Sequence, residues 1–117
     1  MRNISERRDA AVELNTKEYW QKRFIDGDWE KMGGEEQSSF FAQLFLENMP
    51  DWLEKDLEQK KWEVADYGCA EGAGTALIAR KFPRCHFTGY DFSSAAISTA
   101  QKKYPTCNFC EGNMAEQ

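Results

Sequence analysis

The spacing of apolar residues changes about halfway along the chain. In the first half, apolar side chains recur every three or four positions, and a glycine-rich stretch at 26–37 interrupts them. We expect three helices there: one from Ser5 to about Phe24, a second from about Ser38, and a short third after Pro50.

In the second half, short apolar runs alternate with helical patterns. The runs at 62–67, 86–91 and 108–112 predict strands, and the segments at 74–82 and 94–104 predict helices. A β-α-β-α-β order implies parallel strands joined by right-handed crossovers. The expected fold class is therefore α/β: a partial Rossmann-like, doubly wound parallel sheet of strand order 3-2-1, preceded by N-terminal helices.

Composition bounds the class of protein. The 117 residues suffice for one domain, and 41% hydrophobic with 30% charged residues is a globular composition. The net charge of −5 and the absence of a basic run argue against a nucleic-acid partner. No segment of the sequence has the apolar run of an export signal or a membrane span, so we expect a cytoplasmic protein with no membrane partner.

The sequence holds four cysteines, which we interpret as free thiols: Cys69, Cys85, Cys107 and Cys110. Three of them could gather at one end of the sheet, but structural zinc needs four ligands. The extra donor, His86, is adjacent to Cys85, and neighbouring side chains of a strand point to opposite faces. We therefore expect no metal site.

The stretch "GCAEGAG" and an aspartate further along carry the functional signal. The turn from the first strand into its helix holds only small residues at alternating positions: Gly68, Ala70, Gly72 and Gly74. The N-terminal end of a helix at this turn is suited to bind a ligand. Asp91 ends the second strand, where its carboxylate can accept hydrogen bonds from both hydroxyls of a ribose. This combination indicates nucleoside recognition.

These residues resemble the class I S-adenosylmethionine-dependent methyltransferases. The family's first motif is an acid, any residue, then Gly-x-Gly-x-Gly, and "DYGCAEG" is similar to it with Ala70 in place of the middle glycine. The resemblance continues through "GYDFSSAAISTAQKKYP" and "FCEGNMAE" and covers about residues 62–116. It implies S-adenosyl-L-methionine as cofactor, with 1–61 as an N-terminal helical lid and 62–117 as the first half of the cofactor-binding domain.

The resemblance also implies roles for single residues. Near the methionine moiety it places Asp66, Gly68, Cys69, Ala70 and Gly72. It implies that Asp91 holds the ribose hydroxyls, that Phe92 packs on the adenine, and that Asn113 and Met114 reach the adenine amino edge and face. Lid residues closing over the methionine end would be Tyr19, Trp20, Arg23 and Gln37.

The function that follows is transfer of the sulfonium methyl group to an unidentified acceptor, with the catalytic residues unknown. A nicotinamide-dependent dehydrogenase half-domain is an alternative; its G-x-G-x-x-G pattern would fall on Gly68, Ala70 and Ala73. A non-catalytic nucleoside-binding or assembly module is another.

The sequence stops just after the third expected strand. We therefore expect a truncated chain that is inactive alone, because it holds the cofactor half and lacks the acceptor half. In the order 3-2-1-4, loss of a fourth strand leaves the first strand with an open edge, so we expect a homodimer of the fragment.

Overall fold

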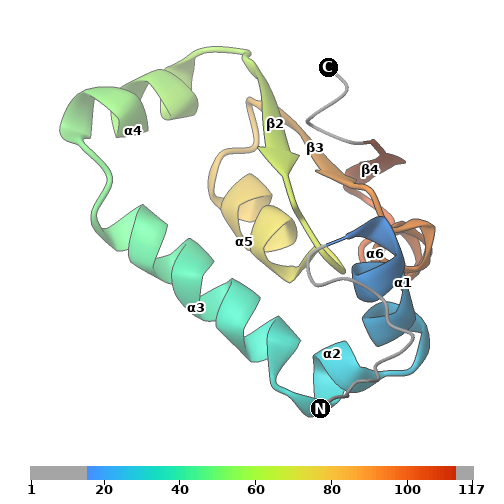
Figure 1. Cartoon of the computed structure of the whole chain (residues 1–117). Coiled ribbons are helices and arrows are strands. Elements are labelled where there is room, and N and C mark those ends of the chain that lie inside the picture. Colours follow the sequence, from blue (N-terminus) through green and yellow to red (C-terminus); the bar gives the residue numbers. More distant parts are fainter. Residues whose placement is uncertain (1–15, 113–117) are drawn as a thin grey trace.

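The computed structural model describes residues 16–112, which form helices in the first half and an alternating sheet-and-helix unit in the second (Figure 1). In chain order the elements are α1 (Lys17–Ile25), α2 (Asp28–Lys31), α3 (Gly34–Glu47), α4 (Asp51–Gln59), β2 (Glu63–Tyr67), α5 (Ala73–Lys81), β3 (His86–Asp91), α6 (Ser94–Lys103) and β4 (Asn108–Glu111).

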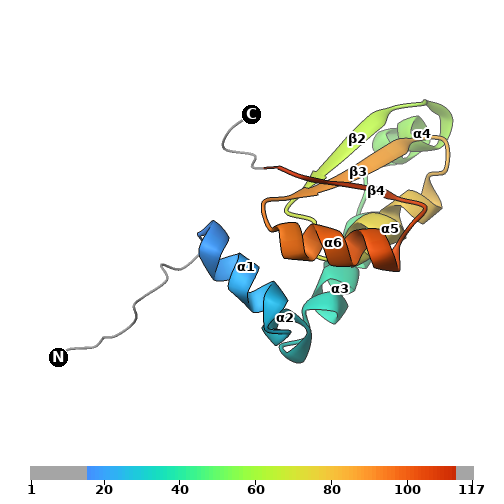
Figure 2. The same ribbon diagram turned by 90° about the vertical axis from the view of Figure 1, so that its right-hand side faces the viewer.

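The strands form one parallel sheet in the order β2-β3-β4, with Val64 opposite Phe87 and Gly89 opposite Phe109. The predicted α/β class and parallel sheet are confirmed, and the observed order is compatible with the expected 3-2-1. Helices α5 and α6, which connect successive strands, both lie beneath the sheet in Figure 2. Right-handed crossovers between neighbouring strands place their helices on the same face.

The opposite face of the sheet carries no helix among the described residues. On that face the rings of Tyr67 and Tyr90 stack with their centroids 4.8 Å apart. Along β2 the side chains are only half-buried or exposed. Strand β2 is an edge strand with one uncovered face in residues 16–112, which agrees with the open edge expected for the first strand.

Two helix starts differ from the sequence expectation. The expected start of the first helix at Ser5 lies outside the described residues, and the described helix α1 begins at Lys17. Thr16 is extended and caps α1, its hydroxyl accepting a hydrogen bond from the N–H of Tyr19. Helix α3 begins at Gly34 rather than Ser38, because Gly33 adopts a left-handed conformation and the helix can start directly after it.

The two halves of the chain share one core. Met49 and Leu57 from the helical half pack with Phe82, Cys85 and Phe87 from the second half. Helix α3 lies along α5 (Figure 1) and approaches it through small residues: a Cβ added at Gly74 would lie 3.3 Å from the carbonyl oxygen of Ser38. The predicted start of α4 after Pro50 is confirmed.

Small residues of α3 face α5, and four large apolar side chains of this helix are exposed. Phe40, Phe41, Leu44 and Phe45 are all exposed, with Phe41 at 64%. Contiguous exposed apolar surface of this kind is characteristic of an interface. None of the helices described between residues 16 and 112 has the length and apolar character needed to cross a membrane.

The loop between β2 and α5 turns through three left-handed residues. Gly68, Ala70 and Gly72 have φ angles of 80°, 52° and 93°. A Cβ added at Gly72 would lie 2.7 Å from the Phe109 ring, whereas one added at Gly68 would meet nothing within 4 Å. Position 72 therefore requires glycine for both its backbone conformation and its packing, whereas position 68 favours glycine for its conformation alone.

This difference gives a matched pair of stability predictions. Gly68→Ala should lower the free energy of unfolding by about 1 kcal/mol, the cost of a left-handed alanine. Gly72→Ala should lower it by about 3 kcal/mol, because the methyl group also overlaps Phe109. Urea unfolding monitored by circular dichroism measures both. Equal losses for the two variants would contradict the packing role of Gly72.

Candidate functional site

The glycine loop and Asp91 meet because β2 and β3 are parallel neighbours whose carboxyl ends lie at the same edge. The backbone N–H groups of Gly68 and Cys69 donate to the carbonyl oxygen of Tyr90, at 2.7 and 2.9 Å. This pair of hydrogen bonds fixes the first turn of the loop beside the end of β3.

Asp91 is the centre of this edge. Its side chain is buried, with the residue 8% exposed. One carboxylate oxygen accepts from the N–H of Ala70 at 2.9 Å and the other from the N–H of Ser93 at 3.0 Å. Each oxygen keeps a further lone pair for a ligand hydroxyl. The left-handed turn at Ala70 is what presents its N–H to the carboxylate.

A cavity of about 300 Å³ lies over this carboxylate. Aromatic rings from the N-terminal helices form one wall, and the loop with the end of β3 forms the other; the lining residues are Trp20, Phe24, Trp29, Gly68, Ala70, Asp91 and Phe92. The Phe24 and Trp29 ring centroids are 5.2 Å apart. The arrangement offers hydrogen-bond acceptors on one side and flat apolar surfaces on the other.

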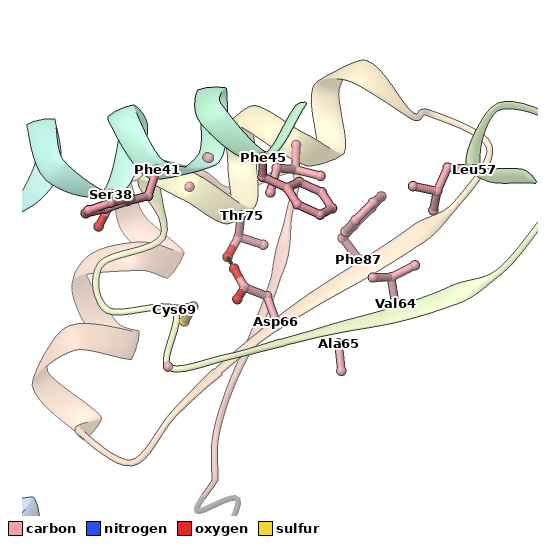
Figure 3. A pocket seen from close by; sticks show the side chains of 14 residues that line it. Ser38, Phe41, Phe45, Leu57, Val64, Ala65, Asp66, Cys69, Thr75 and Phe87 are labelled. Atoms are coloured by element: carbon pink, nitrogen blue, oxygen red, sulfur yellow. Dashed lines mark hydrogen bonds between the residues drawn. The ribbon is translucent and has the colours of Figure 1, made fainter. Parts of the chain in front are cut away.

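A larger cavity, of about 490 Å³, lies on the helix-covered side of β2 (Figure 3). In this view Phe45, Phe87, Val64 and Leu57 surround an apolar hollow, and Ala65 points away from it. Its volume is greater, but its lining does not include Asp91. We therefore take the smaller, polar-floored cavity as the candidate ligand site.

Asp66 stabilises the glycine loop and does not line the aromatic-walled cavity. Its carboxylate accepts a hydrogen bond of 2.5 Å from the hydroxyl of Thr75, which is 1% exposed, in the first turn of α5 (Figure 3). This contact ties the end of β2 to the start of α5 beneath the glycine loop.

Cys69 is buried beside the loop and lines the larger cavity. Burial, followed by the nearby carboxylates of Asp91 and Asp66, raises the pKa of its thiol far above the usual range. A thiol in this setting stays protonated and is a poor nucleophile. Its position suits lining rather than reaction.

The expected lid residues separate into two groups. Trp20 lies at the cavity, and the ring of Tyr19 packs edge-on against the ring of Trp20. The guanidinium of Arg23 lies 5.6 Å from the Tyr19 ring centroid and 5.8 Å from that of Trp20. The Arg23 Nε is buried without a hydrogen-bond partner. Gln37 is exposed on α3 and lines neither cavity.

Two expected adenine contacts, Asn113 and Met114, lie outside the described residues. The structure adds residues that sequence reasoning missed. Trp29 stands in the glycine-rich interruption, where no periodic pattern marks it. Thr75 donates its side-chain hydrogen bond to Asp66, a contact that no local motif predicts.

Between residues 16 and 112 no group of three or more histidine, cysteine or acidic side chains is arranged to hold a metal ion. The Cys85 thiol instead donates to the carbonyl oxygens of Leu57 and Lys60, each at 3.3 Å. All four cysteines are free.

Comparisons with known proteins find relatives for the second half of the chain. Residues 64–117 match a family model described as a methyltransferase domain. Trans-aconitate 2-methyltransferase of Yersinia pestis (strain Pestoides F) is 37% identical over 51 residues, which are 44% of this chain and 20% of that protein. The enzyme of the same name from Escherichia coli O139:H28 is 41% identical over 58 residues, 50% of this chain and 23% of that protein.

The chain thus aligns with about a fifth of the length of these curated relatives. In its fold it resembles the crystal structure of the plantazolicin methyltransferase BpumL in complex with a monoazolic desmethylPZN analog and SAH. The TM-score is 0.62 at 23% sequence identity, over 86% of this chain and 40% of that one. Residues 64–117 thus match a methyltransferase domain, and the glycine loop, Asp91 and the parallel sheet agree with the expected resemblance to the class I S-adenosylmethionine-dependent methyltransferases.

Proposed function

We propose that this chain binds S-adenosyl-L-methionine in the cavity of about 300 Å³ and serves as the cofactor-binding portion of a methyltransferase. The observation that carries the proposal is the buried Asp91 carboxylate, held by two backbone N–H groups and facing an aromatic-walled cavity. The related plantazolicin methyltransferase BpumL, whose structure is a complex with SAH, supports the same cofactor.

The residues present fit this cofactor. Asp91 would accept the ribose hydroxyls, and the half-buried Phe92 beside it would pack on the adenine. A Cβ at Gly68 would enter open space, so the loop leaves room for the methionine portion close to its backbone. Asn113 and Met114 stay predictions for the adenine edge.

The lid residues fit the methionine end. Trp20 lines the cavity with Phe24 and Trp29, and Tyr19 packs on Trp20. The buried Arg23 Nε lacks a partner, and a carboxylate such as that of methionine would supply one. Gln37 would contribute only if α3 approached the site more closely.

The bound cofactor supplies an electrophilic methyl group for in-line displacement by the acceptor. The part of this chain described in the structure contributes orientation and exclusion of water, which account for much of the rate enhancement in such transfers. The methyl acceptor of the whole protein stays open, since this chain aligns with only 20% and 23% of its curated relatives.

The four free thiols favour a reducing compartment, and we propose a cytoplasmic location. We also propose that the chain of 117 residues forms a homodimer. Phe41 and Phe45 border the larger cavity, which lies along the edge strand β2. A second copy placed there would cover both the apolar surface and the strand edge.

Removal of the Asp91 carboxylate tests the cofactor assignment. Asp91→Ala should weaken binding of S-adenosylhomocysteine by about 2 to 3 kcal/mol, because two ribose hydroxyls lose a charged acceptor. Isothermal titration calorimetry measures the change. The matched control is Glu111→Ala, which removes the exposed carboxylate opposite Asp91 on β4 and should leave the affinity unchanged.

An unchanged affinity in Asp91→Ala would contradict the ribose assignment. Tighter binding of NAD than of S-adenosylhomocysteine by the unaltered chain would favour the dehydrogenase alternative. Thermal unfolding of each variant separates lost binding from lost folding, since Asp91 also satisfies the N–H groups of Ala70 and Ser93.

Thiol titration tests the cysteine assignment. In the native chain a disulfide reagent should modify exposed Cys110 first and half-buried Cys107 more slowly, while buried Cys69 and Cys85 react only after denaturation. Denatured, non-reduced protein should show all four thiols, and elemental analysis should find no stoichiometric zinc. Two thiols, or one zinc per chain, would contradict the assignment.

Light scattering tests the homodimer. The unaltered chain should have twice the mass of the monomer at micromolar concentration, and Phe45→Asp should shift it to the monomer by placing a charge in the apolar surface. Ile25→Asp is the matched control, since Ile25 is an exposed apolar residue on α1, away from this surface. A monomeric unaltered chain would overturn the proposal.

A further inference from the structure

Gln21, on α1, makes a set of long-range contacts that the sequence pattern does not predict. Its side-chain oxygen accepts from the hydroxyl of Ser93 at 2.5 Å and from the N–H of Ala95 at 3.2 Å. Its side-chain nitrogen donates to the hydroxyl of Ser94 at 2.8 Å. One amide thus binds three successive residues at the start of α6, across more than 70 positions of sequence.

These contacts satisfy groups that a helix start leaves unpaired. Ser93 is fully buried, and its hydroxyl also accepts from the N–H of Ala96 as the cap of α6. A hydroxyl has one proton to donate, and here the proton goes to Gln21. Gln21 therefore fixes the orientation of the Ser93 side chain.

Ser93 connects this contact to the candidate ligand site. Its N–H donates to one oxygen of Asp91, and the other oxygen accepts from the N–H of Ala70 in the glycine loop. A continuous chain of hydrogen bonds thus runs from the loop through Asp91 and Ser93 to Gln21 on α1.

Helix α1 also forms a wall of the cavity. Trp20 and Phe24, one position before and three positions after Gln21, both line it. Phe24 packs with Ala70 and Ala96, so apolar contact accompanies the hydrogen bonds. Another polar contact between α1 and the sheet edge is the ion pair of Lys17 with Glu111, whose side chains are about half exposed. Exposed pairs of this kind contribute little.

We propose that Gln21 is a positioning residue that ties the lid helix α1 to the edge bearing Asp91 and so holds Trp20 and Phe24 over the bound nucleoside. This inference rests on the proposed function. A residue that only caps α6 would affect stability alone, whereas a positioning residue also affects ligand affinity and the closure of α1.

Three variants separate these roles. Gln21→Leu keeps the side-chain size and removes every hydrogen bond. Gln21→Glu keeps an acceptor for the Ser93 hydroxyl and the Ala95 N–H, and Ser94 can donate to the carboxylate. Gln43→Leu makes the same chemical change on α3, where Gln43 is exposed and bonds only to Glu47 among the contacts of its side chain.

The measurements are calorimetric affinity for S-adenosylhomocysteine and amide hydrogen exchange of residues 17–25 in the full chain. Gln21→Leu should weaken binding about tenfold, as expected for buried polar groups left unpaired, and should accelerate exchange in α1. Gln21→Glu should restore both to near the unaltered values, and Gln43→Leu should change neither. If Gln21→Leu does not fold, Ser94→Ala removes a single contact and should show smaller changes in the same directions.

Unchanged affinity and unchanged α1 exchange in Gln21→Leu would overturn the inference. Loss of stability with normal affinity would reduce Gln21 to a helix cap and overturn it equally. If the unaltered chain binds no S-adenosylhomocysteine while Gln21→Leu still accelerates exchange in α1, the proposed function fails and the tether between α1 and α6 stands.

Discussion

The buried carboxylate of Asp91 imposes the constraint on which the candidate site depends. A charge placed inside a protein is costly unless hydrogen-bond donors surround it. The chain supplies those donors from two directions, the N–H of Ala70 from the glycine loop and the N–H of Ser93 from the approach to α6. Satisfying one carboxylate therefore fixes the loop, the end of β3 and the start of α6 relative to one another, and leaves a rigid acceptor facing the cavity.

The loop donates to Asp91 because of its left-handed backbone conformation and because Phe109 packs against its other side. Its N–H groups reach Tyr90 and Asp91 because Gly68, Ala70 and Gly72 take left-handed conformations. Phe109, on β4, fills the space that side chains at Gly72 and Gly89 would need, each added Cβ lying 2.7 Å from its ring. The backbone thus comes close to the ligand site on one side and to an aromatic ring on the other, which explains why so many small residues gather in this stretch.

Local sequence signals predicted the second half of the fold well. The strand at 86–91 has the predicted bounds, and the helices at 73–81 and 94–103 differ by one residue, because prolines and glycines mark their ends. The convergence of the loop and Asp91 also followed, since parallel strands end at a common edge.

Contacts between distant side chains were not predictable in this way. The bonds of Thr75 with Asp66 and of Gln21 with Ser93 depend on how helices pack against the sheet, and no spacing in the sequence records them. The exposure of Phe41 on α3 has a related cause, because the close approach of α3 to Gly74 requires small residues such as Ala42 at that contact. The roles that the family resemblance implies for single residues stay predictions, because each role depends on a contact with a bound ligand.

The two cavities on either side of Gly68 differ in what they can hold. The larger one is lined chiefly by aliphatic and aromatic side chains, and the Asp66 carboxylate within it already binds Thr75. A sugar buried there would lie mostly against apolar side chains, at a cost of roughly one to several kcal/mol for each hydroxyl left without a partner. The smaller cavity pairs aromatic walls with Asp91, whose oxygens keep lone pairs to spare. Polar satisfaction, and not volume, therefore selects the smaller cavity for a nucleoside and leaves the larger one to apolar side chains.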